Sequence, residues 1–154
     1  MQMPTTAGII EYVAGLSGRP VEAQEVRAKL APGPGIFYAT YIDDEDRPGA
    51  VALVDAAFAA YAGGALAMSS CRGARAAVRA SELDPVLDDG FREVMNVFSA
   101  LLNAPGATHY RLRAVTAEPP ADVEVILTSC TMRGDWFVGV EGYGSGRFSV
   151  LGMG

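Results

Sequence analysis

The strongest constraint on the fold is the stretch from Gly49 to Met68, which is apolar at nearly every position. It is about as long as a membrane-spanning helix, which needs roughly 20 apolar residues. However, it contains Asp55, and it is rich in Ala and Gly where a spanning helix is rich in Leu and Ile. Its beginning, AVALV, is typical of a strand. We therefore predict a buried strand over Ala50–Val54, then a core helix from Asp55 to Met68, and no membrane association.

Length and composition favour one domain over residues 1–154. Half of the residues are hydrophobic and 19% are charged, which argues against extensive disorder. The formal charge of -6 argues against a nucleic-acid partner, because binding to phosphates needs clustered Lys and Arg. No basic segment followed by an apolar run opens the chain, so we expect no secretory signal and a cytoplasmic protein.

Two small groups of residues are interpreted as structural. The cysteines Cys71 and Cys130 have no metal-type spacing. We expect two mostly buried free thiols in a reducing compartment, although the sequence leaves a disulfide between them open. Arg72, Arg75 and Arg79 are three and four residues apart, which is typical of a solvated helix face.

Periodicity and turn residues predict the α/β class, of the α+β type, with helices packed on an antiparallel sheet. Helices are expected over Ala7–Leu16, with Thr5 or Thr6 as its cap, and over Asp89–Asn103. Strands are expected over Val21–Leu30, Ile36–Ile42, Ala50–Val54, His109–Thr116, Asp135–Val140 and Arg147–Leu151, with a short element over Asp122–Ser129. The segment Ser69–Asp88 is harder to assign: Arg72–Ser81 could be helical, and Pro85 is expected to interrupt what precedes it.

The helix predicted over Asp89–Asn103 has one polar line opposite its apolar stripe. At 100° per residue, the large apolar side chains fall on one side of this helix. The opposite side carries Asp89, Glu93, Asn96 and Ala100 in line. Because Glu93 and Asn96 are three residues apart, they are neighbours on the helix surface. An outward-facing Asn in mid-helix contributes little to folding. Taken without further evidence, Glu93 and Asn96 are more often part of an ordinary solvated helix face.

The spacing of these residues resembles a known signature. Asp89, three residues, Glu93, two residues, Asn96, 22 residues and then Pro119 match the pattern of the CheC/CheX/FliY chemotaxis phosphatases. Pro120 also lies beside the last position. The length, the first helix, the GAVALV strand leading into an Ala-rich helix and the terminal hairpin look most like CheX. The resemblance implies the CheC-like fold, which has a pseudo-two-fold axis.

The resemblance also implies a function. The protein would hydrolyse the aspartyl phosphate of a CheY-type response regulator, and Asn96 would position the attacking water. Glu93 would pair with a Lys of the receiver domain. Asp89, expected at the helix start, where an acid favours the helix dipole, would be accessory with Ala100, and Pro119 would shape a loop. No cofactor is expected on this chain, whereas Mg²⁺ is expected on the partner regulator.

The family is built of two related halves, and the first half of this chain lacks part of the signature. Setting the two helices side by side places Ala7, Glu11 and Ala14 at the positions of Asp89, Glu93 and Asn96. One working site per chain is therefore implied, as in CheX, together with a homodimer that allows strand exchange.

Three functions stay open at this point. The first is the phosphatase, and the second is a binding module of the same fold that docks a receiver or a flagellar-switch partner without turnover. The third is a homodimeric adaptor in another signalling system. Hydrolysis by other groups is not expected: His109 has no acid or nucleophile near it in sequence, and Ser129–Cys130 lacks the glycines of a nucleophile elbow.

Overall fold

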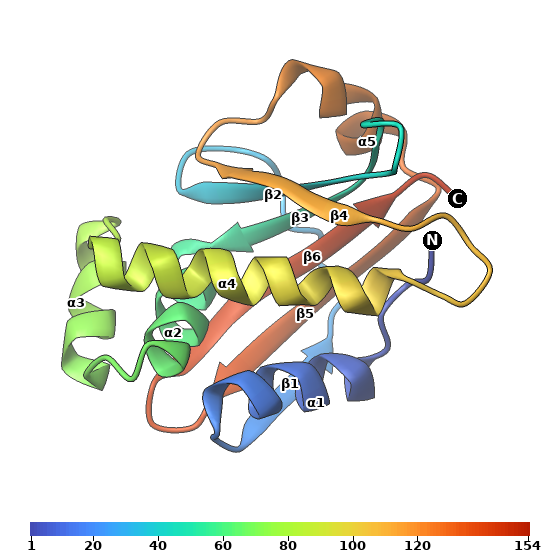
Figure 1. Ribbon diagram of the computed structural model, residues 1–154. Helices are drawn as coiled ribbons and strands as arrows, with labels where there is room; N and C mark the ends of the chain where they lie inside the picture. The colour runs from blue at the N-terminus through green and yellow to red at the C-terminus, as the bar shows by residue number, and fades with distance from the viewer.

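All 154 residues are described by the computed structural model, in which helices cover a six-stranded antiparallel sheet (Figure 1). The α+β class predicted from the sequence is confirmed. The helices are α1 (Thr6–Ser17), α2 (Ala56–Leu66), α3 (Cys71–Ala80), α4 (Pro85–Leu102) and α5 (Glu124–Ser129), with a 3₁₀ turn η1 (Ala121–Val123). The strands are β1 (Val21–Glu25), β2 (Ile36–Ile42), β3 (Pro48–Asp55), β4 (Arg111–Thr116), β5 (Met132–Val140) and β6 (Gly144–Gly152).

The chain contains the same arrangement twice, which confirms the expected pseudo-two-fold fold. Helix α1 is followed by β1 and the hairpin β2–β3, and helix α4 is followed by β4 and the hairpin β5–β6. The strand order is β1-β5-β6-β3-β2-β4, so each half places its first strand against the hairpin of the other half. The central pair β3–β6 joins the halves.

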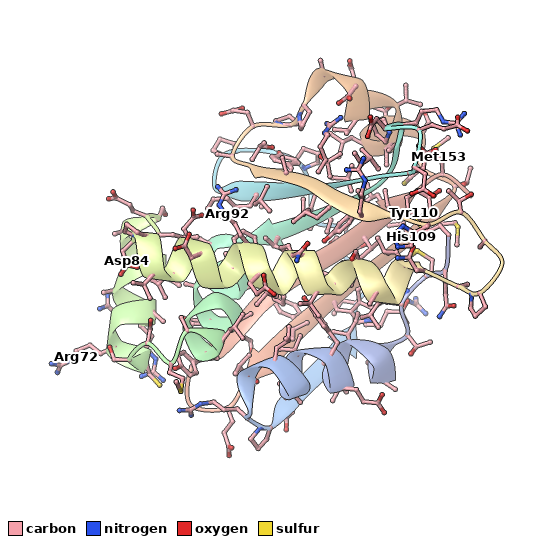
Figure 2. All side chains as sticks on the ribbon, in the orientation of Figure 1. Arg72, Asp84, Arg92, His109, Tyr110 and Met153 are labelled. Atoms are coloured by element: carbon pink, nitrogen blue, oxygen red, sulfur yellow. The ribbon has the colours of Figure 1, made fainter.

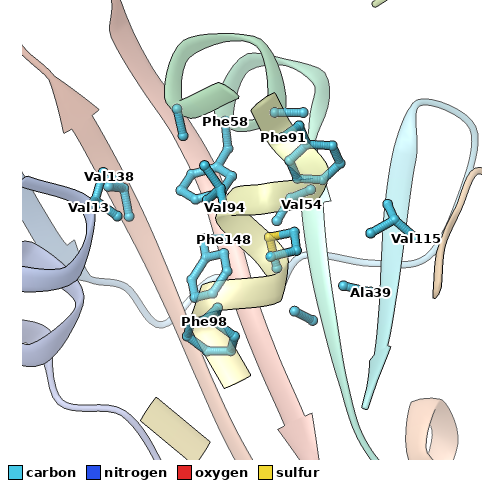
Figure 3. Packing of buried hydrophobic residues seen from close by; sticks show 14 of the residues in the cluster. Val13, Ala39, Val54, Phe58, Phe91, Val94, Phe98, Val115, Val138 and Phe148 are labelled. Carbon is cyan, nitrogen blue, oxygen red and sulfur yellow. The ribbon is translucent and has the colours of Figure 1, made fainter. Parts of the chain in front are cut away.

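The main core lies between the sheet and the helices α1, α2 and α4. Val94 and Phe98 of α4 are buried, and the ring of Phe98 meets that of Phe148 edge-on at 5.0 Å (Figure 3). Aromatic rings in this geometry stabilise the fold slightly more than the burial of their apolar surface alone would. A smaller cluster on the opposite face packs Val123 and Ile126 of η1 and α5 against β2, β3 and β6. The apolar stretch at 49–68 thus forms a buried strand and a core helix, and no helix is long and apolar enough to span a membrane.

Helix α4 crosses α2 with their backbones in contact, because both helices have Gly at the crossing. A Cβ added to Gly90 would lie 2.2 Å from the carbonyl oxygen of Gly63. A Cβ added to Gly63 would lie 2.7 Å from the backbone nitrogen of Phe91. Neither backbone can move aside easily in a packed core. This crossing fixes where the first half of α4 lies on the molecule.

Gly90→Ala is therefore expected to lower the free energy of unfolding by about 3 kcal/mol, because the methyl group overpacks the helix crossing. The matched control is Gly15→Ala in α1, where an added Cβ meets nothing within 4 Å. That variant is expected to gain about 0.5–1 kcal/mol from helix propensity. Urea denaturation measures both. Equal stability of the two variants would contradict the close crossing.

Several expected elements have other bounds in the structure. The terminal hairpin strands β5 and β6 are longer than predicted, and the short element near Asp122 consists of η1 and α5. The strand predicted over Val21–Leu30 ends at Glu25, because the backbone of Leu30 binds side chains of β5 instead of a neighbouring strand. The last expected strand before η1 begins at Arg111, two residues after His109. The unassigned segment contains α3, whose face with Arg72, Arg75 and Arg79 is exposed. Cys71 and Cys130 are free and partly buried, which excludes the disulfide left open by the sequence.

A buried ion pair holds the loop 26–35 against the sheet. Asp135 is 5% exposed, and its carboxylate accepts hydrogen bonds from Arg133 at 2.7 Å and from the hydroxyl of Ser149 at 2.5 Å. It also accepts from the backbone N–H of Leu30 at 2.9 Å. Burial alone would raise the pKa of Asp135, but these donors together lower it below the ordinary value.

Asp135→Asn is expected to lower the free energy of unfolding by about 3 kcal/mol at pH 7, because it leaves Arg133 buried without a charged partner. A carboxylate with a lowered pKa stabilises the fold above its unfolded pKa of about 3.9 and loses this effect as the pH falls through the folded value. The difference between the two proteins should therefore shrink in denaturation curves below about pH 4. Asp122→Asn, at an exposed pair with Arg113, should cost less than about 1 kcal/mol. A constant difference down to pH 2 would contradict the assignment.

Candidate functional site

Helix α4 begins earlier than the sequence predicted, and this changes the role of Asp89. The side chain of Asp84 caps the helix by accepting from the N–H of Leu87 at 2.9 Å, and Pro85 follows in the first turn. Proline is tolerated there because the first N–H groups of a helix have no internal partner. Asp84 lies at the end of the helix in Figure 2. The expectation that Asp89 starts the helix is wrong, since it lies four residues after Pro85.

The structure places four of the predicted site residues on one line. Asp89, Glu93, Asn96 and Ala100 are all exposed along α4, while the opposite face is buried in the core. The side chains of Glu93 and Asn96 make no hydrogen bond or ion pair within the chain. These two polar groups are thus free to bind an external partner. Their role in a site stays a prediction.

Pro119 is not on this line. It is an exposed residue of the loop between β4 and η1, where the hydroxyl of Thr116 donates to the carbonyl of Glu118 at 2.7 Å. The loop is connected to α4 only indirectly: Arg92 donates to the carbonyl of Val115 on β4 at 3.2 Å. Pro119 brings no functional group to the exposed line, and its expected role in shaping a loop stays a prediction.

Arg92 is a residue that the sequence analysis missed. Its guanidinium binds Asp88 at 2.8 Å and lies on the side of α4 that faces β4 (Figure 2). The i,i+4 spacing of Asp88 and Arg92 is the sequence signal that indicates this pair. Because Arg92 is directed toward Asp88 and β4, Glu93 has no arginine partner and keeps an unpaired carboxylate at the surface.

Two tyrosines, also missed, lie beneath the site. The hydroxyl of Tyr12 in α1 donates to the carbonyl of Val94, and that of Tyr41 in β2 donates to the carbonyl of Met95 at 2.8 Å. Burial raises the pKa of Tyr12 well above its usual value, and the nearby charge of Glu93 raises it further. Burial likewise raises the pKa of Tyr41. Both phenols therefore stay protonated and act as donors.

The surface around Glu93 and Asn96 is open. None of the hollows described on the molecule is lined by residues of the exposed line. No group of three or more His, Cys, Asp or Glu side chains is arranged to hold a metal ion. The hydroxyl of Ser99 donates to the carbonyl of Asn96 at 2.8 Å. The geometry suits a macromolecular surface that brings its reactive group to an exposed carboxylate and amide.

Comparison with known proteins supports the fold. No protein-family model and no curated protein sequence matches the chain. Among solved structures, the FliM middle domain from H. pylori aligns with a TM-score of 0.62 and 10% identity, over 96% of this chain and 84% of that one. FliY from Thermotoga maritima aligns with a TM-score of 0.56 and 13% identity, over 94% and 81%. The CheX–CheY–BeF₃–Mg²⁺ complex from Borrelia burgdorferi aligns with a TM-score of 0.52 and 8% identity, over 99% and 100%.

The chain therefore has the fold shared by the CheC/CheX/FliY proteins and the FliM middle domain. The fold that the resemblance implied is thereby confirmed, whereas the roles of Asp89, Glu93, Asn96 and Pro119 stay predictions. Identities of 8–13% carry no information about activity.

The start of α4 at Pro85 can be tested by comparing the stability effects of its capping residue, Asp84, and of the surface residue Asp89. Asp84→Ala is expected to lower the free energy of unfolding by about 1 kcal/mol, because it removes the N-cap acceptor of α4. Asp89→Ala on the exposed line should stay within about 0.5 kcal/mol of the wild type. Thermal and urea denaturation of both variants measure this. A larger loss for Asp89→Ala would restore Asp89 as the residue that begins the helix.

Proposed function

We propose that this protein is a phosphatase that hydrolyses the aspartyl phosphate of a CheY-type response regulator. The observation that carries the proposal is the exposure of Glu93 and Asn96, one helical turn apart, on an open surface and without partners in their own chain. These are the two residue types, at the spacing, that the resemblance assigns to this chemistry.

Hydrolysis of an acyl phosphate requires few catalytic groups from the phosphatase. Phosphoryl transfer depends mainly on positioning and on electrostatic stabilisation, and the carboxylate of the aspartate is a good leaving group. Asn96 would hold a water in line with the phosphorus, because an amide oxygen accepts a hydrogen bond while its NH₂ donates. The water attacks the phosphorus, the bond to the aspartyl oxygen breaks, and phosphate leaves. Mg²⁺, where it takes part, would be held by the receiver.

Glu93 would fix the docking register. An unpaired surface carboxylate can accept a charged hydrogen bond from a lysine of the receiver, and such bonds contribute about 1.5–3 kcal/mol. Its place one turn from Asn96 would orient the phosphorylated site over the amide. Asp89 and Ala100 at either end of the line would contact the partner, and Pro119 would support the adjacent loop. The accompanying proposal from the family resemblance is a homodimer.

A second candidate is a binding module without turnover. The same fold occurs in the FliG–FliM and FliM–SpeE complexes from H. pylori, with TM-scores of 0.55 and 0.60. In both complexes a FliM domain of this fold is bound to another protein, and this makes docking without catalysis the second candidate. The two candidates differ in the role of Asn96. In a binding module its side chain contributes only to the contact surface, whereas a phosphatase requires its amide group to hold the attacking water.

The decisive experiment compares dephosphorylation of a phosphorylated CheY-type receiver by wild type, Asn96→Ala and Glu93→Ala. Asn96→Ala is expected to lower turnover at least about 100-fold with binding kept, since it loses the water-positioning group. Glu93→Ala should weaken binding about 10-fold or more.

The matched control is Glu11→Ala, which removes the exposed carboxylate of α1 at the position equivalent to Glu93. It should keep the wild-type rate. Binding of the receiver with no acceleration by the wild type would reject the phosphatase in favour of the binding module. Absence of both would reject the two candidates together.

A further inference from the structure

Three consecutive carbonyls in the middle of α4 accept hydrogen bonds from side chains. Val94 accepts from Tyr12, Met95 from Tyr41, and Asn96 from the hydroxyl of Ser99. Inside a helix, each carbonyl already accepts from the N–H four residues later. A carbonyl oxygen has a second lone pair, which these hydroxyls use. The segment that carries Glu93 and Asn96 is therefore held by donors from outside the helix as well as by its own hydrogen bonds.

The two tyrosines reach α4 from different elements and from different sides. Tyr12 comes from α1 and Tyr41 from β2, and their rings lie 5.6 Å and 5.7 Å from the ring of Phe98. Tyr41 is fully buried, so its hydroxyl has no water to replace the carbonyl of Met95. A rotation of α4 about its axis would break both hydrogen bonds and disturb the contacts of Phe98 with the two tyrosine rings.

We call the hydrogen bonds that Tyr12 and Tyr41 donate to carbonyls of α4 the brace. The brace is present on only one of the two related helices. In the alignment of the halves that pairs Glu11 with Glu93, Tyr12 falls at the position of Val94. Tyr12 thus donates to the carbonyl of Val94, the residue at the equivalent position of α4. Helix α4 contains no tyrosine that could donate to α1 in return. The carbonyls of α1 accept no side-chain hydroxyl. The helix that is braced is the one that has Asn96, whereas the helix with Ala14 at that position is not braced.

We infer that Tyr12 and Tyr41 are positioning residues, which set the rotation of α4 and so the direction in which Glu93 and Asn96 project. This inference rests on the proposed phosphatase function. With Cα atoms at a radius of about 2.3 Å, a rotation of about 20° moves them by roughly 0.8 Å. A displacement of about 1 Å at a reacting group can lower a rate 100-fold. Neither tyrosine needs to touch the receiver.

The test uses Tyr12→Phe and Tyr41→Phe, which remove only the hydroxyl groups. The matched control is Tyr143→Phe, since Tyr143 is also buried and donates to a backbone carbonyl, that of Ser69, at 2.5 Å, outside α4. Each variant is assayed for turnover of the phosphorylated receiver and for binding to the beryllofluoride-activated receiver. The expected result is a roughly 10-fold lower kcat for Tyr12→Phe and Tyr41→Phe with unchanged binding, and a wild-type kcat for Tyr143→Phe.

A second readout does not depend on activity. In ¹H–¹⁵N spectra, the amide resonances of Glu93 and Asn96 should shift in Tyr12→Phe and Tyr41→Phe and stay in place in Tyr143→Phe. The positioning role is overturned by an unchanged kcat in both Tyr12→Phe and Tyr41→Phe, or by an equal loss in Tyr143→Phe. If the wild type has no activity, the proposed function fails, and the spectra alone decide: unshifted resonances of Glu93 and Asn96 reject the brace, and selective shifts support it.

Discussion

The structure depends on how closely α4 approaches the rest of the molecule. Gly63 and Gly90 let α2 and α4 touch backbone to backbone, and this contact allows Phe91, Val94 and Phe98 to reach the sheet at full packing density. The small residues of β3 and α2 make room for these large side chains. A core of this kind leaves α4 little freedom to shift, so its exposed line has a defined place on the surface.

The chemistry proposed here needs such a support because Glu93 and Asn96 line none of the hollows described on the molecule. In an enclosed active site, walls and lining side chains position the reacting groups. Glu93 and Asn96 stand on a convex helix surface, so their geometry comes from the helix alone and from what holds it. Below them lie Phe98 and the phenols of Tyr12 and Tyr41, and beside them Arg92 connects α4 to β4. The partner would supply the rest of the site, including the phosphoryl group.

Much of this arrangement could be predicted from the sequence, for physical reasons that can be named. The strand at Ile36–Ile42 has the observed bounds because β-branched and aromatic residues end there at an acidic turn. The exposed line follows from helical periodicity, which holds wherever one face is buried. Pro85 does separate α4 from the helix before it, but the sequence pattern does not show that α4 itself begins there, because the cap at Asp84 is a contact visible only in the structure. The prediction that the strand continues beyond Glu25 is wrong because it rests on local alternation of polar and apolar residues. The backbone N–H of Leu30 donates to Asp135, which lies more than 100 residues away in the sequence. The roles of Tyr12 and Tyr41 depend on packing between elements, which no local pattern contains.

The exchange of first strands between the halves also has a consequence for how the chain folds during synthesis. β1 pairs only with β5, so the strand at Val21–Glu25 has no hydrogen-bonding neighbour until β5, more than 100 residues later, has been synthesised. Contacts between such distant segments slow folding, because a long loop must close before they form. The nascent first half consequently carries an open strand edge, an aggregation risk that its charged residues Glu22 and Glu25 reduce. Neither half can complete its sheet alone, which makes the two halves one cooperative unit.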